Sequence, residues 1–122
     1  MRNFERMNLV DILLETQKRK SEYFKNYEFY SRKIKEIAER ILKDVKIIVF
    51  GSVVRNEYTP NSDIDILIIS KNLPEDMEKR AEIRTGIKST LDSFSPFQIH
   101  LATPDEFENW YKNFIKEDYI EI

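Results

Sequence analysis

A chain of 122 residues, with 41% hydrophobic and 34% charged residues, is expected to form one soluble globular domain. Its net charge of −2 offers no global positive field for nucleic acid, and no apolar run is long enough to span a membrane. The absence of cysteine excludes disulfides, thiolate metal sites and a cysteine nucleophile, which fits a cytoplasmic protein.

The first third of the chain predicts helix. Residues 8–43 contain no glycine or proline, and their apolar residues recur mostly at steps of three and four, which suits one long helix or two in series. The Lys18-Arg19-Lys20 run is interpreted as a solvated helix face. We therefore expect a single domain, residues 1–122, with a helical N-terminal segment over 1–44 and a sheet core with a C-terminal helix over 45–122.

Aromatic residues are dense in this helical segment and admit two interpretations. They could form a surface for a partner protein, because Phe24 and Phe29 lie off the main apolar stripe. The alternative is that the rings pack on the sheet. The residues concerned are Tyr23, Phe24, Tyr27, Phe29 and Tyr30.

Two short strands are predicted next, with a loop between them. Residues 46–50 are an apolar run rich in β-branched side chains, and Gly51 ends it. Residues 56–61 contain Asn, Thr and Pro and predict the loop. Residues 64–69 form the second apolar run. Both of its faces are apolar beyond Asp65, so we expect a central strand that is covered on each side.

The remaining chain predicts a helix, a third strand and a last helix. A helical pattern follows Pro74, with Gly86 as its weak point, and residues 97–103 predict a strand. Thr103 and Pro104 suit the N-cap and first position of the last helix. That helix should bury one stripe, made of Phe107, Trp110, Tyr111, Phe114 and Ile115. The order α-β-β-α-β-α predicts a fold that contains both helices and strands, of the α/β (α+β) class. We expect a small mixed β-sheet flanked by helices.

Two carboxylates stand at the start of the second strand. Asp63 and Asp65 are two residues apart, so an extended backbone would direct both side chains to one face. Like charges repel there, and a divalent cation that prefers hard oxygen ligands, Mg²⁺ or Mn²⁺, would stabilise both. The alternative is a solvated strand end in which Ser62 and Asp63 cap a turn.

The turn after the first strand offers groups that bind phosphate. Gly51 permits close approach of a ligand to the backbone, and the Ser52 hydroxyl with the following amides can hold phosphate oxygens. Arg55 adds a cationic fork. Each feature alone is ordinary turn chemistry or a solvated arginine. Their combination with the two acids, in the order strand, turn, loop and strand, indicates a nucleotide site.

These residues resemble the signature of the minimal nucleotidyltransferases, a family within the polymerase-β-like nucleotidyltransferase superfamily. The match is a Gly-Ser pair, ten intervening residues and an Asp-x-Asp triplet, carried by Gly51, Ser52, Asp63 and Asp65. The resemblance implies a small mixed sheet flanked by helices and Mg²⁺-dependent transfer of a nucleoside monophosphate from a nucleoside triphosphate to an acceptor. By position, Asp63 and Asp65 would be the catalytic metal ligands. Gly51, Ser52 and Arg55 would hold the triphosphate.

One position departs from the family pattern. Active members usually carry a third carboxylate on a later strand, and alternation here places Gln98 and His100 on one face of that strand. These are the two possible third-ligand positions. Gln98 can donate an oxygen ligand but cannot take a proton, whereas His100 could act as a base, a ligand or a hydrogen-bonded structural residue. The alternative to an active enzyme is therefore a catalytically impaired module that binds nucleotide or a partner.

The resemblance also implies a partner. Larger relatives attach a helical domain that holds the acceptor, and this chain has little room for one, so the acceptor would belong to a second protein or a second copy. Many minimal nucleotidyltransferases act as antitoxins beside a helical ribonuclease toxin of the HEPN type. They can attach AMP, taken from ATP, to a tyrosine of that partner. We expect the same arrangement here, with a homodimer as a further option.

Overall fold

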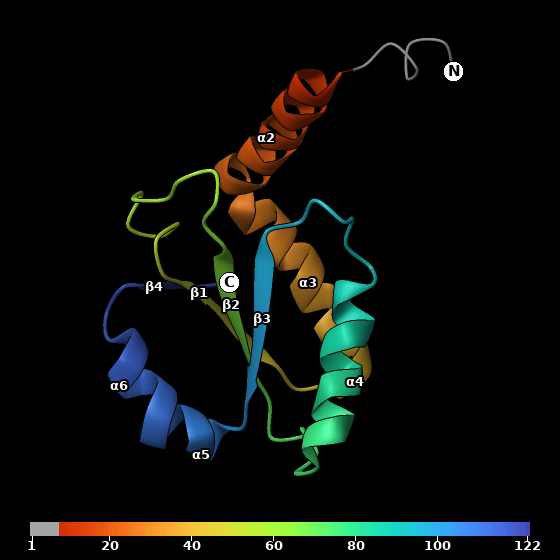
Figure 1. The fold of residues 1–122 in the computed structure, drawn as a ribbon. Helices are drawn as coiled ribbons and strands as arrows, with labels where there is room; N and C mark the ends of the chain where they lie inside the picture. Colours follow the sequence, from red (N-terminus) through yellow and green to blue (C-terminus); the bar gives the residue numbers. More distant parts are fainter. Residues whose placement is uncertain (1–7) are drawn as a thin grey trace.

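The computed structural model describes residues 8–122 (Figure 1). Its elements, in chain order, are α2 (Leu9–Lys25), α3 (Tyr27–Leu42), β1 (Lys46–Phe50), β2 (Ile64–Ile69), α4 (Met77–Lys88), β3 (Phe97–Ala102), α5 (Pro104–Glu106), η1 (Phe107–Tyr111), α6 (Lys112–Ile115) and β4 (Tyr119–Glu121). The expected α+β fold is confirmed. Within this range no helix combines the length and apolar character needed to cross a membrane.

The strands form one mixed sheet in the order β3-β2-β1-β4. β1 pairs antiparallel with both β2 and β4, whereas β2 and β3 run parallel and are joined through α4. The predicted central place of the second strand is confirmed, because all but one of its residues are buried. β4 was not predicted. It has only three residues, none fully buried, so it carries little strand signal of its own.

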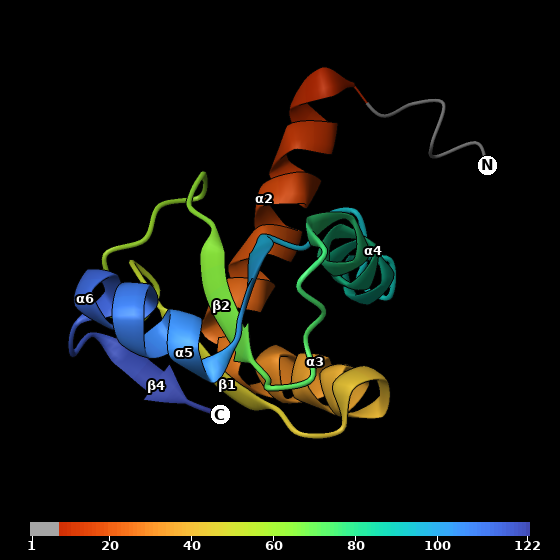
Figure 2. The ribbon, with the colours of Figure 1, turned by 90° about the horizontal axis from the view of Figure 1, so that it is seen from below.

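Helices cover both faces of the sheet (Figures 1 and 2). Alternation along β1 sends Ile47 and Val49 to the face packed by α2, α3 and α4, and it sends Ile48 and Phe50 to the other face. That second face is covered by η1 and α6, from which Ile115 is buried against it and Phe107 and Tyr111 pack partly buried. β1 and β2 therefore each contribute to two apolar layers, as their two-sided hydrophobic runs require.

The described part of the N-terminal segment predicted to be helical is two helices in series, and residues 1–7 of that prediction lie outside the described residues. α2 begins with a capping box, in which the Asn8 side chain accepts a bond from the Asp11 amide and the Asp11 carboxylate accepts one from the Asn8 amide. Asn26 separates α2 from α3, and its amide binds the Glu22 carbonyl. The local signals at Asn8 and Asn26 thus set where α2 begins and ends.

The aromatic residues of this segment mostly pack in the core. Tyr23 and Phe24 are buried, and Tyr27 and Tyr30 are partly buried against the same cluster. Of the five, Phe29 alone is exposed. The interpretation of these rings as a partner surface is therefore wrong for all but Phe29, and the packing alternative holds.

The last helical segment also departs from its predicted stripe. η1 is a π-helix, whose wider turn shifts the phase of the side chains that follow it. Ile115 is buried as expected, but Trp110 and Phe114 are each 71% exposed. The apolar residues at steps of three and four therefore do not share one buried face here.

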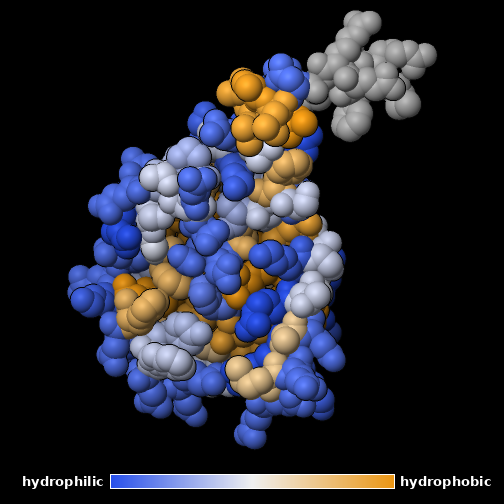
Figure 3. Space-filling model, viewed as in Figure 1, coloured by the Kyte–Doolittle hydropathy of each residue, from blue (hydrophilic) through white to orange (hydrophobic). Residues whose placement is uncertain are grey.

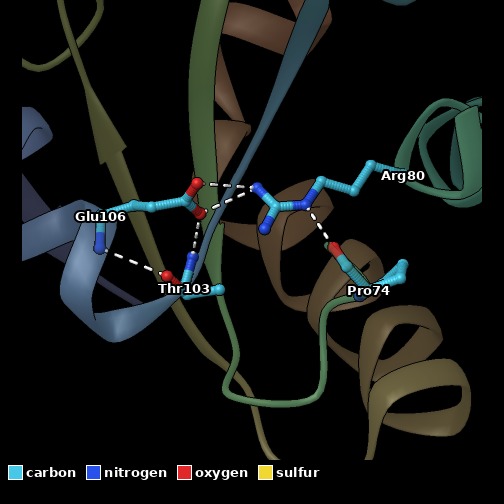
Figure 4. A network of polar contacts seen from close by, with 4 residues as sticks. All are labelled: Pro74, Arg80, Thr103 and Glu106. Carbon is cyan, nitrogen blue, oxygen red and sulfur yellow. Dashed lines mark hydrogen bonds and ion pairs between the residues drawn. The ribbon is translucent and has the colours of Figure 1, made fainter. Parts of the chain in front are cut away.

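An ion pair between buried Arg80 and partly exposed Glu106 joins α4 to α5 (Figure 4). The Arg80 guanidinium donates to the Glu106 carboxylate at 2.8 Å and to the Pro74 carbonyl at 2.6 Å. Glu106 also accepts from the Thr103 amide at 2.8 Å and completes a capping box. The Thr103 amide and then Arg80 hold the pKa of Glu106 below its ordinary value, against the opposing effect of burial. This network holds α4 against the segment that follows β3, at the end of the sheet where α5 begins.

Replacing Glu106 by glutamine should lower the free energy of unfolding at pH 7 by about 1–2 kcal/mol, because the buried Arg80 charge loses its counter-ion while Glu106 is itself partly exposed. The lowered folded-state pKa means that the Glu106 contribution is complete at neutral pH and is lost as the pH falls through that pKa. Urea unfolding at pH 7 and at about pH 3 measures this change.

The matched control is Glu108→Gln, which removes only an exposed pair with Lys112 and should change stability little. An equal effect of Glu106→Gln at both pH values would contradict the assignment of that stability to the ionised carboxylate.

Candidate functional site

The turn after β1 is compact and anchored. Gly51 has a φ of +91°, in the left-handed region that favours glycine. Its carbonyl accepts from the amides of Val54 and Arg55 at 3.2 and 3.4 Å. The buried Val53 fixes the turn to the core, and Ser52, half-buried, stands between Gly51 and this anchor. The turn is thereby held in place at the end of β1.

Strand pairing puts the Asp65 carboxylate against this turn. Phe50 pairs with Asp65 across β1 and β2, so Gly51 follows directly beside it. A Cβ atom on Gly51 would lie 2.8 Å from Oδ2 of Asp65, closer than side chains normally approach. Glycine is required here twice, for its backbone angle and for the space that it leaves to the carboxylate. The Asp65 side chain keeps 31% of its surface exposed and can reach a ligand.

The third strand brings His100 to Asp65. The parallel register pairs Asp65 with Gln98, and both polar side chains of β3 lie on the predicted face. His100 Nε2 lies 3.2 Å from Asp65 Oδ1, while Gln98 is exposed. The His100 ring also lies near two aromatic rings, with centroids 5.5 Å from Phe50 and 6.4 Å from Tyr111. Of the two candidate third positions, His100 is the one in contact with the Asp65 carboxylate.

Asp63 and Arg55, the other charged residues predicted for the site, are more exposed than Asp65. Asp63 precedes β2 and is exposed. Arg55 forms an exposed ion pair with Glu57, with Nε to Oε2 at 3.2 Å. Ser62 acts as a turn residue, because its hydroxyl accepts from the Thr59 amide at 2.9 Å. The turn expected around Ser62 is thus present, and the Asp63 carboxylate faces solvent.

Phe50 and Tyr111 were not predicted as neighbours of the site. Alternation along β1 could have identified Phe50, because it pairs with Asp65 and shares its face of the sheet. Tyr111 reaches His100 from η1, and the π-helical phase that brings it there leaves no simple periodic signal.

The donor groups suit a hard divalent cation that is shared with a substrate. Carboxylates from Asp63 and Asp65 are available, and the His100 imidazole lies beside Asp65. Among residues 8–122, no three His, Cys, Asp or Glu side chains lie together as a metal site of their own. Mg²⁺ is commonly held by one or two carboxylates together with substrate phosphates, rather than by a cage of protein ligands. The residues present fit a cation of that kind.

Comparison with known proteins supports the same chemistry. A family model described as "Nucleotidyltransferase domain" matches residues 31–122. Two Methanocaldococcus jannaschii proteins, provisionally named protein adenylyltransferases, are each 36% identical to this chain. One match covers 65% of this chain and 89% of that protein, and the other covers 73% of this chain and 94% of that protein. A solved structure provisionally named a nucleotidyltransferase is 33% identical, with a TM-score of 0.62 over 76% of this chain and 97% of that chain.

A second solved structure, from Sulfolobus solfataricus, is 22% identical and has a TM-score of 0.57 over 88% of this chain and 83% of its own. It shows that the fold is shared. The family match over residues 31–122 covers the strands, the turn and the carboxylates of the candidate site.

The two glycines of the chain allow a matched test of the Gly51 turn. Gly51→Ala should lower the free energy of unfolding by about 1–3 kcal/mol, because alanine is strained at this φ and its methyl group meets Asp65. Gly86→Ala should raise it by about 0.5–1 kcal/mol, because this position is helical and has open space around it. Denaturant unfolding of both variants gives the comparison. A neutral or stabilising Gly51→Ala would contradict the geometry of the turn.

Proposed function

Since the chain belongs to the nucleotidyltransferase domain family, we propose that it transfers AMP from ATP to a hydroxyl group of an acceptor protein. The observation that carries this proposal is the Asp65 carboxylate, which the β1–β2 register holds against the Gly51 turn. The names of the M. jannaschii relatives support AMP as the group and a protein as the acceptor.

Asp63 and Asp65 would hold the cation, Mg²⁺ or Mn²⁺, which would supply positive charge to the phosphates of the bound nucleotide. Gly51 and Ser52 would orient the triphosphate through the backbone and hydroxyl of the turn. Arg55 would join them, because its ion pair with Glu57 is exposed and weak enough to exchange for phosphate.

The proposed reaction is an in-line displacement at the α-phosphorus. The acceptor oxygen forms the new bond to phosphorus as it gives up its proton, and the bond to the leaving pyrophosphate breaks. The residues of the site act by positioning and by neutralising charge, without a covalent intermediate on the enzyme.

His100 is proposed as a positioning residue for Asp65. It occupies the face on which active relatives usually carry a third carboxylate, and its ring nitrogen contacts Asp65 directly. Packing near Phe50 and Tyr111 limits the orientations of the ring. A fixed imidazole would in turn restrict the carboxylate to one orientation.

The acceptor is proposed to be a tyrosine of a helical HEPN-type partner, to which the chain acts as antitoxin. This rests on the family resemblance of the Gly51–Asp65 signature and on the protein-directed names of the relatives. The second candidate function is an antitoxin that acts by contact alone. It is favoured by the exposed amide of Gln98 and the imidazole of His100, where a third carboxylate would be expected.

Incubation with α-labelled ATP, Mg²⁺ and the helical protein encoded by a neighbouring gene should label that protein. Asp65→Asn should lower the rate by about 100-fold or more, because the cation that neutralises the phosphates loses a charged carboxylate ligand. Glu108→Gln serves as the control. It neutralises an exposed carboxylate in η1 and should retain activity. ATP binding without any label transfer would favour the contact-only antitoxin.

His100 and Gln98 provide a second comparison on one strand. His100→Ala should lower label transfer by about 10-fold or more, because the Asp65 carboxylate loses its partner, whereas Gln98→Ala should have little effect. The increase in Tm on adding ATP and Mg²⁺ reports binding separately from transfer. Equal losses for the two variants would contradict a specific role of His100. A gain of activity in Gln98→Glu would instead show that a missing carboxylate limits the enzyme.

A further inference from the structure

The last turns of α2 pack against the edge of the sheet at which the candidate site lies. The start of the helix projects from the body of the molecule, with hydrophobic side chains exposed at its far end (Figure 3). Its two buried residues, Tyr23 and Phe24, lie at the other end, beside the loop between β1 and β2 (Figure 1). α2 precedes residue 31, where the nucleotidyltransferase match begins. The helix therefore adds contacts to the site from outside the matched domain.

Phe24 contacts the loop between β1 and β2 through an aromatic stack. Its ring, 3% exposed, lies nearly parallel to the ring of Tyr58, with centroids 4.5 Å apart and planes at 5°. Tyr58 is the only aromatic residue between Gly51 and Asp63. Stacked aromatic pairs stabilise a structure beyond the area that they bury. The stack therefore holds one point of the loop against α2.

The loop has few other ties to the body of the protein. In the described chain, the hydrogen bonds made by residues 52–62 all end on residues 51–62. The adjoining Val53 and Val54 anchor the first half of the loop in the core, and Tyr58 anchors the second half. Arg55 lies between these two anchors, and Asp63 follows the second. Loss of the Tyr58 anchor would therefore loosen the chain that carries two proposed site residues.

Tyr23, the residue before Phe24, supports the segment that leads into β3. Its hydroxyl donates to Asp92 Oδ2 at 2.6 Å. The same segment meets the first loop at the start of β2, where the Ile64 amide donates to the Pro96 carbonyl at 2.9 Å. Adjacent residues of one helix thus support the two segments that border the candidate site.

We propose that α2 is a clamp for the candidate site, in which Tyr58 is a positioning residue that acts through its stack on Phe24. The proposal rests on the proposed function, because the clamp holds the loop between the triphosphate turn and Asp63 in the conformation that binds ATP with Mg²⁺. A loop that is already held in its bound form loses less conformational entropy on binding. The stack uses the ring of Tyr58 and not its hydroxyl, so phenylalanine should replace it.

Limited trypsin digestion, below the Tm of every variant, measures how firmly the loop is held. Arg55 is the only lysine or arginine between Lys46 and Lys71, so cleavage after it reports opening of this loop. Tyr58→Ala should be cleaved there about 10-fold faster than the wild type, and Tyr58→Phe should match the wild type. Ile83→Ala truncates another partly buried side chain packed on the same core cluster, so it is the control for lost packing and should not be cleaved faster.

Titration calorimetry of ATP with Mg²⁺ measures the role of the loop in binding. The affinity should be about 10-fold lower for Tyr58→Ala and unchanged for Tyr58→Phe and Ile83→Ala. Unchanged cleavage of Tyr58→Ala, faster cleavage without a loss of ATP affinity, or a Tyr58→Phe chain that behaves like Tyr58→Ala would each overturn the proposal. A wild type that binds no ATP refutes the proposed function and the role of the clamp in binding, whereas failure of the trypsin comparison refutes the clamp alone.

Discussion

The antiparallel register between β1 and β2 is the constraint on which both the core and the site depend. Each strand is buried on two faces, with Ile66 and Ile68 in one apolar layer and Leu67 in the other. A slip of one residue would exchange these layers and would turn Asp65 toward the wrong face. The same register sets Gly51 beside the Asp65 carboxylate. Burial of the strands and placement of the chemistry are therefore one structural requirement.

The sequence predicted the elements whose patterns arise from local burial. The three longer strands have apolar runs or clear alternation, and all were expected near their observed positions. β4 could not be predicted, because its three residues depend on pairing with a strand about 70 positions earlier in the chain. The π-helical phase of η1 and the exposed start of α2 were also missed. A helical period shows that one face is apolar, but it does not show what covers that face.

The candidate site could be predicted only in part, because local spacing shows which residues share a strand but not how distant strands are placed. Spacing predicted that Gly51 and Asp65 lie together, and the β1–β2 register places them side by side. The role of Asp63, which is exposed before β2, stays a prediction. The sequence placed Gln98 and His100 on one face but gave no means of choosing between them. That choice depends on how β3 is staggered against β2, which the α4 crossover and packing in three dimensions determine.

The edge of the sheet at which the site lies has a further consequence. Ligands of doubly wound folds bind at the carboxyl ends of parallel strands, where helix N-termini point at phosphates. Here the site uses the carboxyl end of β1 but the amino ends of β2 and β3, and both α4 and α5 begin at the opposite edge. The macrodipoles of those two helices are thus aimed away from any bound anion. The anion recognition proposed at this edge would therefore rely on discrete donors, the Gly51 turn and Arg55, rather than on a helix N-terminus.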